Sequence, residues 1–168
     1  MPEIRPATTA PHLTPEPRRM KLKTDFVLAS QSPRRRRLLE QIGLDFDVHV
    51  SPVEEIVTPG LAPHHVVEGL AGEKAAAVAG HYPAAVTLGA DTIVVLDGDI
   101  LGKPSGPAEA RAMLRRLSGR THTVYTGIAL VHPASARTVL AHETTGVTFG
   151  ALDDDEIDAY VATGSPLD

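Results

Sequence analysis

The sequence of 168 residues contains no cysteine and no tryptophan, and aromatic residues make up only 4% of it. The lack of cysteine excludes disulfides, thiolate nucleophiles and cysteine metal sites, and it is compatible with a reducing compartment. No apolar run approaches the roughly 20 residues that a membrane-spanning helix needs, and the N-terminus has no apolar stretch typical of a signal peptide. We therefore expect a cytoplasmic protein without a membrane partner.

Basic residues are also in the minority. Sixteen lysines and arginines stand against 21 aspartates and glutamates, which gives a formal net charge of -5. Proteins that bind nucleic acid are usually basic overall, so no specific nucleic-acid partner is expected. The four consecutive arginines at 34–37 are therefore a local feature on an acidic background and need an explanation of their own.

Residues 1–24 hold five of the fourteen prolines and few large apolar residues, a composition that predicts a disordered N-terminal tail. The remainder, 25–168, reads as one domain in which strands and helices alternate. It predicts an α/β fold with a mixed, twisted sheet and flanking helices. We expect strands at 26–29, 46–51, 85–96, 99–102, 122–131 and 137–149, and helices at 33–41, 64–79, 107–118 and 153–164.

The arginine run follows the start signal of a helix, in the segment LASQSPRRRRLL. Ser32 is a good N-cap and Pro33 a good first helical residue. Cations in the first turn are unfavourable beside the helix dipole, unless an anion lies in front of that turn. Backbone N–H groups, serine hydroxyls and guanidinium groups all donate hydrogen bonds to phosphate oxygens. The segment indicates a phosphate site at Ser30, Ser32, Arg34 and Arg35; the alternative is a solvated basic face, because successive residues point about 100° apart.

Asp91 is unusual because its strand, LGADTIVVL, is otherwise apolar. Alternation places Asp91 on the same face as Ile93 and Val95. A carboxylate on a buried face is costly unless it is paired or bound to a metal. Gly89 would let a ligand or another backbone come close. Asp91 is thus a candidate for chemistry; the alternatives are a position at a strand edge in water and a carboxylate that caps a neighbouring backbone group.

Four further residues are candidates with ordinary alternatives. Lys74 lies on the apolar stripe of its predicted helix, where lysine side chains often extend along the surface to reach water. Lys103 follows a hairpin, where lysines are common. Glu54 and Glu55 could hold a hard cation, although adjacent glutamates are usually just solvated.

Taken together, five segments resemble the Maf family of nucleoside triphosphate pyrophosphatases in their order and spacing over about residues 25–168. They are LASQSPRRRRLL, VEE, LAGEKAAAVA, GADTIVVLDGDILGKP and LSGRTHTVYTGIAL. The resemblance implies an elongated, two-lobed fold of the Maf and inosine-triphosphatase type with a central cleft. It implies hydrolysis between the α and β phosphates, to a monophosphate and pyrophosphate, with a divalent cation such as Mg²⁺ or Mn²⁺.

Residue by residue, the resemblance makes Asp91 the general base and Glu54 a cleft residue. We expect Glu54 and Asp91 to be the metal ligands. Arg34 and Thr92 match the branch that acts on dTTP and UTP. The substrate-binding residues that we expect, from the resemblance and from the helix start together, are Ser30, Ser32, Arg34, Arg35, Lys74, Thr92 and Lys103.

Family members continue with a Lys-Ala-Gly-Ala-Tyr-Gly-Ile-Gln-Gly segment and further strands, whereas this sequence stops at Asp168. We therefore expect a C-terminal segment to be absent, together with a glutamine linked to base choice. An alternative function is a non-catalytic nucleotide-binding regulator linked to septum formation. The expected partner is a nucleoside triphosphate, and a homodimer is an alternative to the monomer.

Overall fold

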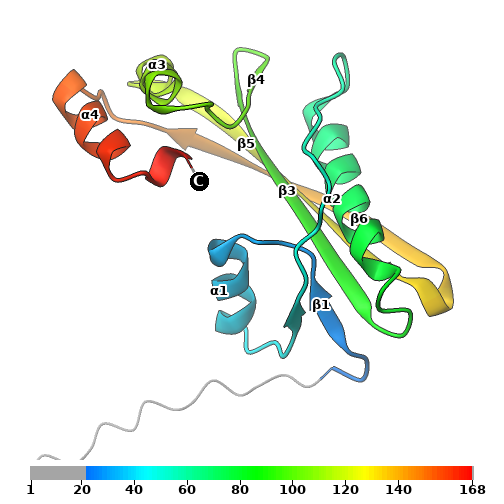
Figure 1. The fold of residues 1–168 in the computed structure, drawn as a ribbon. Coiled ribbons are helices and arrows are strands. Elements are labelled where there is room, and N and C mark those ends of the chain that lie inside the picture. The colour runs from blue at the N-terminus through cyan, green and yellow to red at the C-terminus, as the bar shows by residue number, and fades with distance from the viewer. Residues whose placement is uncertain (1–21, 168) are drawn as a thin grey trace, which may run out of the picture.

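The computed structural model of the protein describes residues 22–167 (Figure 1). Its strands are β1 (Phe26–Leu28), β2 (Asp47–Val48), β3 (Val86–Leu96), β4 (Asp99–Leu101), β5 (Thr121–His132) and β6 (Arg137–Thr148). Its α-helices are α1 (Pro33–Gln41), α2 (Pro63–Ala79), α3 (Pro107–Leu117) and α4 (Asp154–Ala162), with short 3₁₀ turns at Pro133–Ser135 and Ser165–Leu167. The predicted tail lies outside the described residues, except for 22–24.

All six described strands form one sheet in the order β2-β1-β3-β5-β6, with β4 paired to β3. The β1 strand runs parallel to β2 and β3, whereas β3, β5 and β6 are antiparallel neighbours. The predicted α/β fold with a mixed sheet is confirmed. Of the expected strand 46–51, however, only Asp47–Val48 pairs, because its partner β1 is three residues long and Pro52 follows soon after.

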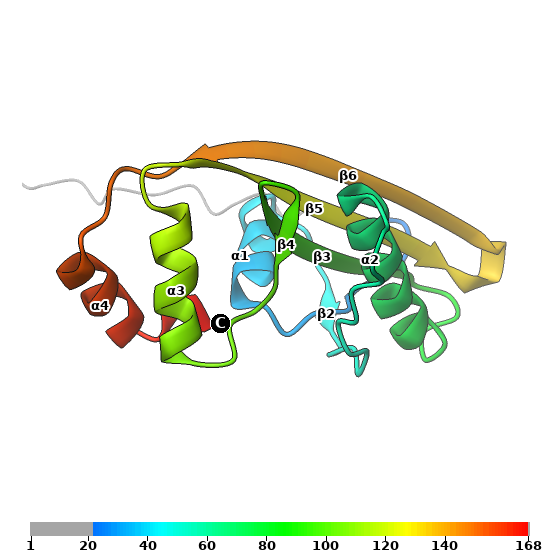
Figure 2. The ribbon, with the colours of Figure 1, turned by 90° about the horizontal axis from the view of Figure 1, so that it is seen from above.

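The long strands set an elongated shape. Figures 1 and 2 show β3, β5 and β6 running through the molecule with α3 and α4 at one end, and Figure 1 shows α1 and α2 on opposite sides of β3. The predicted hairpin after β3 is confirmed, since Asp97 and Gly98 both have positive φ (54° and 88°), as a two-residue turn of this kind requires. No helix within residues 22–167 combines the length and apolar character needed to cross a bilayer.

The α2 helix packs very closely against β3 and β5. An added Cβ at Gly89 would lie 2.1 Å from the carbonyl oxygen of Ala71, and one at Gly127 would lie 2.4 Å from the carbonyl of Val67. Both contacts are with helix backbone, so only glycine fits at these two strand positions. The prediction that Gly89 admits a close neighbour is confirmed, and the neighbour is α2.

The other end of the molecule has a small core of its own. Ala110 and Leu114 of α3 pack against Ile157 and Val161 of α4. The α4 helix begins with a capping box, in which the Asp153 side chain accepts from the Glu156 backbone N–H and the Glu156 side chain accepts from that of Asp153. The α3–α4 pair lies at the far end of β5 and β6 from α2 (Figure 2).

Candidate active site

Asp91 and Lys74 form a buried ion pair between β3 and α2. The face of β3 that carries Asp91 also carries Ile93, which packs on α2, and Asp91 is only 3% exposed. Lys74 Nζ donates to Asp91 Oδ1 over 2.6 Å. Lys74 is itself 6% exposed, so it does not reach out to water. Asp91 is likewise not at a solvated strand edge. Pairing offsets part of the cost of burying the two charges.

Glu55 is the second carboxylate of this cluster. Its Oε1 accepts from Lys74 Nζ, also over 2.6 Å. Glu55 lies in the irregular segment between β2 and α2 and is largely exposed, with 58% of its side chain accessible. Glu54, the expected metal ligand, is exposed beside it. The structure therefore brings Glu55 into contact with Lys74, and Glu54 is not among the side chains it brings together.

The two carboxylates differ in their proton affinity. Burial raises the pKa of Asp91 above its ordinary value of 3.8, and this effect exceeds the opposing hydrogen bond and charge of Lys74. The hydrogen bond from Lys74 lowers the pKa of Glu55, with smaller contributions from the charges of Lys74, Arg35 and Lys103. The site thus combines a firmly ionised carboxylate with one that takes up a proton more readily.

Arg35 joins α1 to the sheet. Its Nη1 donates to Ser30 Oγ over 3.3 Å, and its Nη2 donates to Thr92 Oγ1 over 3.4 Å. Thr92 follows Asp91 directly, so its side chain leaves β3 on the opposite face, where its hydroxyl lies 3.1 Å from that of Thr126. Burial is the main cause that lowers the pKa of Arg35, and the charges of Asp91 and Glu55 oppose it. Three expected residues, Ser30, Arg35 and Thr92, are therefore brought together.

The remaining predicted substrate-binding residues are Ser32, Arg34 and Lys103, and each relates differently to this group. Ser32 is the N-cap residue of α1, as expected, but its side chain makes no capping hydrogen bond, and its backbone N–H donates to Ser30 Oγ over 3.1 Å. Arg34 is exposed and close enough to affect Arg35 electrostatically. Lys103 is exposed after β4, and its charge acts on Glu55.

Sequence reasoning did not select Thr126 or weigh Glu55 above Glu54. Thr126 stands opposite Thr92 in the β3–β5 register, so strand pairing is what reveals it. The contact of Glu55 with Lys74 depends on the path of the irregular segment between β2 and α2. The sequence shows Glu54 and Glu55 as a pair but does not show which of them contacts Lys74, and it gives no signal for Thr126.

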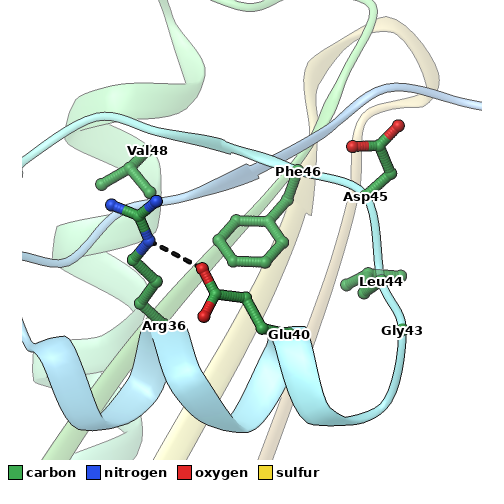
Figure 3. Close-up of a pocket in the computed structure, with 7 residues that line it drawn as sticks. All are labelled: Arg36, Glu40, Gly43, Leu44, Asp45, Phe46 and Val48. Carbon is green, nitrogen blue, oxygen red and sulfur yellow. Dashed lines mark hydrogen bonds and ion pairs between the residues drawn. The ribbon is translucent and has the colours of Figure 1, made fainter. Parts of the chain in front are cut away.

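A cavity of about 270 Å³ lies away from these residues, between α1 and β2 (Figure 3). It is lined by Arg36, Glu40, Gly43, Leu44, Asp45, Phe46 and Val48. The Arg36 side chain points to Glu40, with Nε 2.9 Å from Oε1, in an exposed ion pair. The cavity shares no lining residue with the Lys74 cluster, so we do not assign the candidate site to it.

Comparison with known proteins agrees with the motifs. Residues 25–168 match the model of the family described as Maf-like protein. A dTTP/UTP pyrophosphatase of Salinibacter ruber is 53% identical over 149 residues, which are 89% of this chain and 73% of that protein. One of Pelotomaculum thermopropionicum is 54% identical over 143 residues, 85% of this chain and 75% of that protein.

Among solved structures, the chain is similar to a HAM1 protein from Coxiella burnetii. The identity is 18% and the TM-score 0.47, over 86% of this chain and 94% of that one. The family assignment depends on the family model and on the two sequence relatives, which agree with the five motifs. The chain therefore belongs to the Maf family.

Proposed function

We propose that the protein hydrolyses dTTP and UTP to the monophosphate and pyrophosphate. Relatives more than 50% identical to it carry the name dTTP/UTP pyrophosphatase. The observation that carries the proposal is the buried Asp91–Lys74 pair, together with Arg35, which donates to Ser30 and to Thr92, the residue next to Asp91 on β3. A carboxylate next to cationic and hydroxyl donors suits the positioning of water against a polyanion.

The balance of charge favours a triphosphate. The charges of Lys74 and Arg35 act on both Asp91 and Glu55, and that of Lys103 acts on Glu55. Exposed Arg34 adds a fourth cation. We infer that Arg35 and the α1 N-terminus hold phosphate oxygens, since guanidinium and free N–H groups match them in geometry and charge. Exposed Lys103 adds a point charge where negative charge develops in the transition state.

Only one of the two carboxylate oxygens of Asp91 accepts a hydrogen bond from Lys74. Oδ1 accepts from Lys74, which fixes the orientation of the carboxylate and favours its ionised form. Oδ2 is then available to accept a proton from the attacking water. The burial of Asp91 also raises its proton affinity, which makes it a stronger base than an exposed aspartate.

A divalent cation is implied by the family resemblance, and the carboxylates fit one. No group of three or more acidic or histidine side chains within 22–167 is arranged to hold a metal ion. Mg²⁺, however, is usually held by one or two carboxylates together with substrate phosphates. Asp91 and Glu55 would supply the carboxylates, with Glu54 beside them. A bound ion neutralises phosphate charge and lowers the pKa of water.

The proposal places the protein in the cytoplasm, with nucleoside triphosphates as its partners. A homodimer stays a prediction. Neither statement affects the assignment of the residues above.

The test is release of pyrophosphate from a panel of nucleoside triphosphates with Mg²⁺ or Mn²⁺, and with chelator as the control. We expect turnover of dTTP and UTP to exceed that of the purine nucleotides and to stop without metal. Nucleotide binding without pyrophosphate release would contradict the proposal and support a regulatory function.

A further inference from the structure

Glu55 and Asp91 are bridged by an ammonium group. Lys74 Nζ is 2.6 Å from Oε1 of Glu55 and 2.6 Å from Oδ1 of Asp91. Since each oxygen is 2.6 Å from the same nitrogen, the two oxygens are at most 5.2 Å apart. Lys74 thus holds together the two carboxylates that would ligate a metal ion.

The ammonium occupies the space between Oε1 and Oδ1 that an ion bridging these two oxygens would need. Mg²⁺ binds oxygen at about 2.0–2.1 Å, so two oxygens on one ion lie within about 4.2 Å of each other. Oε1 and Oδ1 are each already committed to Lys74 as acceptors. A divalent ion between them would also be repelled by the buried lysine charge at close range, where solvent screening is weak. The ion and the ammonium therefore compete for the same pair of carboxylates.

Only one side of the bridge can open easily. Asp91 is held in the middle of β3 and is almost fully buried, whereas Glu55 lies in an irregular segment and is largely exposed. The Glu55–Lys74 contact is the one that can separate without disturbing the sheet. Once a triphosphate is present, its oxygens can accept from Lys74 in place of Glu55 and can also ligate the ion.

We propose that the ammonium group of Lys74 prevents a divalent metal ion from binding to Asp91 and Glu55 in the free protein, so that the metal binds together with the nucleotide. This inference rests on the proposed function, because it assumes that the metal serves nucleotide hydrolysis. Lys74 is on this view a positioning residue for Asp91 and Glu55 before substrate arrives.

The test measures Mn²⁺ binding without turnover, by electron paramagnetic resonance of free Mn²⁺. We expect Lys74→Gln to bind Mn²⁺ at least tenfold more tightly than the wild type, because it removes the competing charge and leaves both carboxylates in place. Lys74→Arg, which keeps a cation, should stay as weak as the wild type. A non-hydrolysable dUTP analogue should restore tight Mn²⁺ binding to the wild type.

A matched control separates the effect of the Lys74 ammonium between the two carboxylates from the effect of losing any nearby positive charge. Lys103→Gln also removes one positive charge near Glu55, but it leaves the Lys74 bridge intact, so its Mn²⁺ affinity should change by less than threefold. Equal affinities of the wild type and Lys74→Gln would overturn the proposal, and so would an equal gain in Lys103→Gln. If Lys74→Gln does not fold, Lys74→Met decides: it also removes the ammonium and leaves both carboxylates in place, so it should show the same gain in Mn²⁺ affinity, and wild-type affinity in it would overturn the proposal.

The outcome is distinguishable from failure of the proposed function. Mn²⁺ affinity is measured on the protein without turnover, and pyrophosphate release is assayed separately. A tenfold gain in Lys74→Gln, together with no hydrolysis by the wild type, would retain the metal exclusion and reject the pyrophosphatase assignment.

Discussion

Lys74 on α2 donates a 2.6 Å hydrogen bond to Asp91 on β3, and the two residues are 17 positions apart in the sequence. The bond crosses a contact between helix and strand that is closer than usual, because Gly89 and Gly127 lack side chains where α2 passes over them. The chemistry of the site and the packing of the core are therefore linked, and they can be tested separately.

Replacement of Asp91 by asparagine tests its role as a base. The amide oxygen can still accept from Lys74, but the side chain can no longer take a proton from water. We expect kcat for dTTP to fall by about 10²- to 10⁴-fold, the range that general base catalysis contributes. Steady-state pyrophosphate release gives kcat, and a thermal melt shows that folding is retained. Wild-type turnover in this variant would remove Asp91 from the mechanism.

The acid limb of the pH profile tests the environment of Asp91. Burial raises its pKa above 3.8, while the hydrogen bond and charge of Lys74 act in the lowering direction. Activity that needs ionised Asp91 should therefore be lost, as the pH falls, at a pH above 3.8. In Lys74→Met the lowering causes are gone, so the limb should move to still higher pH. The profile of kcat/KM against pH measures this, and an unchanged or lower limb would argue against the pair.

Replacement of Gly127 by alanine tests the close approach of α2. The new Cβ would lie 2.4 Å from helix backbone, so the helix must move. Overpacking of this kind costs about 1–3 kcal/mol. Gly69 on α2 is the matched control, because a Cβ there meets nothing within 4 Å, and alanine within a helix gains about 0.5–1 kcal/mol over glycine. Urea unfolding of both variants should give changes of opposite sign; similar changes would mean that the contact is not tight.

Neighbouring arginines of α1 provide a test of substrate binding. Arg35 donates to Ser30 and Thr92, whereas Arg36 forms an exposed pair with Glu40. We expect Arg35→Gln to raise KM for UTP at least tenfold, because a charge-assisted hydrogen bond is worth about 1.5–3 kcal/mol. Arg36→Gln should change KM by less than twofold. Steady-state kinetics on both, with Arg34→Gln alongside, would show which arginine of the run contacts substrate, and equal effects would contradict the assignment.

Much of the fold could be predicted because its signals are local. The bounds of α1 follow from Ser32 and Pro33 at its start and Gly43 beyond its end, and the turn at Asp97 and Gly98 follows from residues that tolerate positive φ. The exception is the strand expected at 46–51, whose length depends on how much of β1 is available to pair with it.

The site was predictable in part for the same reason. Asp91 stands out because a carboxylate interrupts an apolar strand, and that signal is present in the sequence itself. The contact of Lys74 with Glu55, and the position of Thr126 opposite Thr92, depend on an irregular segment and on strand register. Both are set by tertiary packing, which periodicity does not encode.

Asp91 and Thr92 are consecutive residues whose side chains leave β3 on opposite faces. A change of side chain at position 92 therefore leaves the contacts between Asp91 and α2 in place. During evolution, a chain built this way can acquire a new preference among its ligands through mutations on the exposed face, while the hydrolytic machinery behind the strand is inherited unaltered.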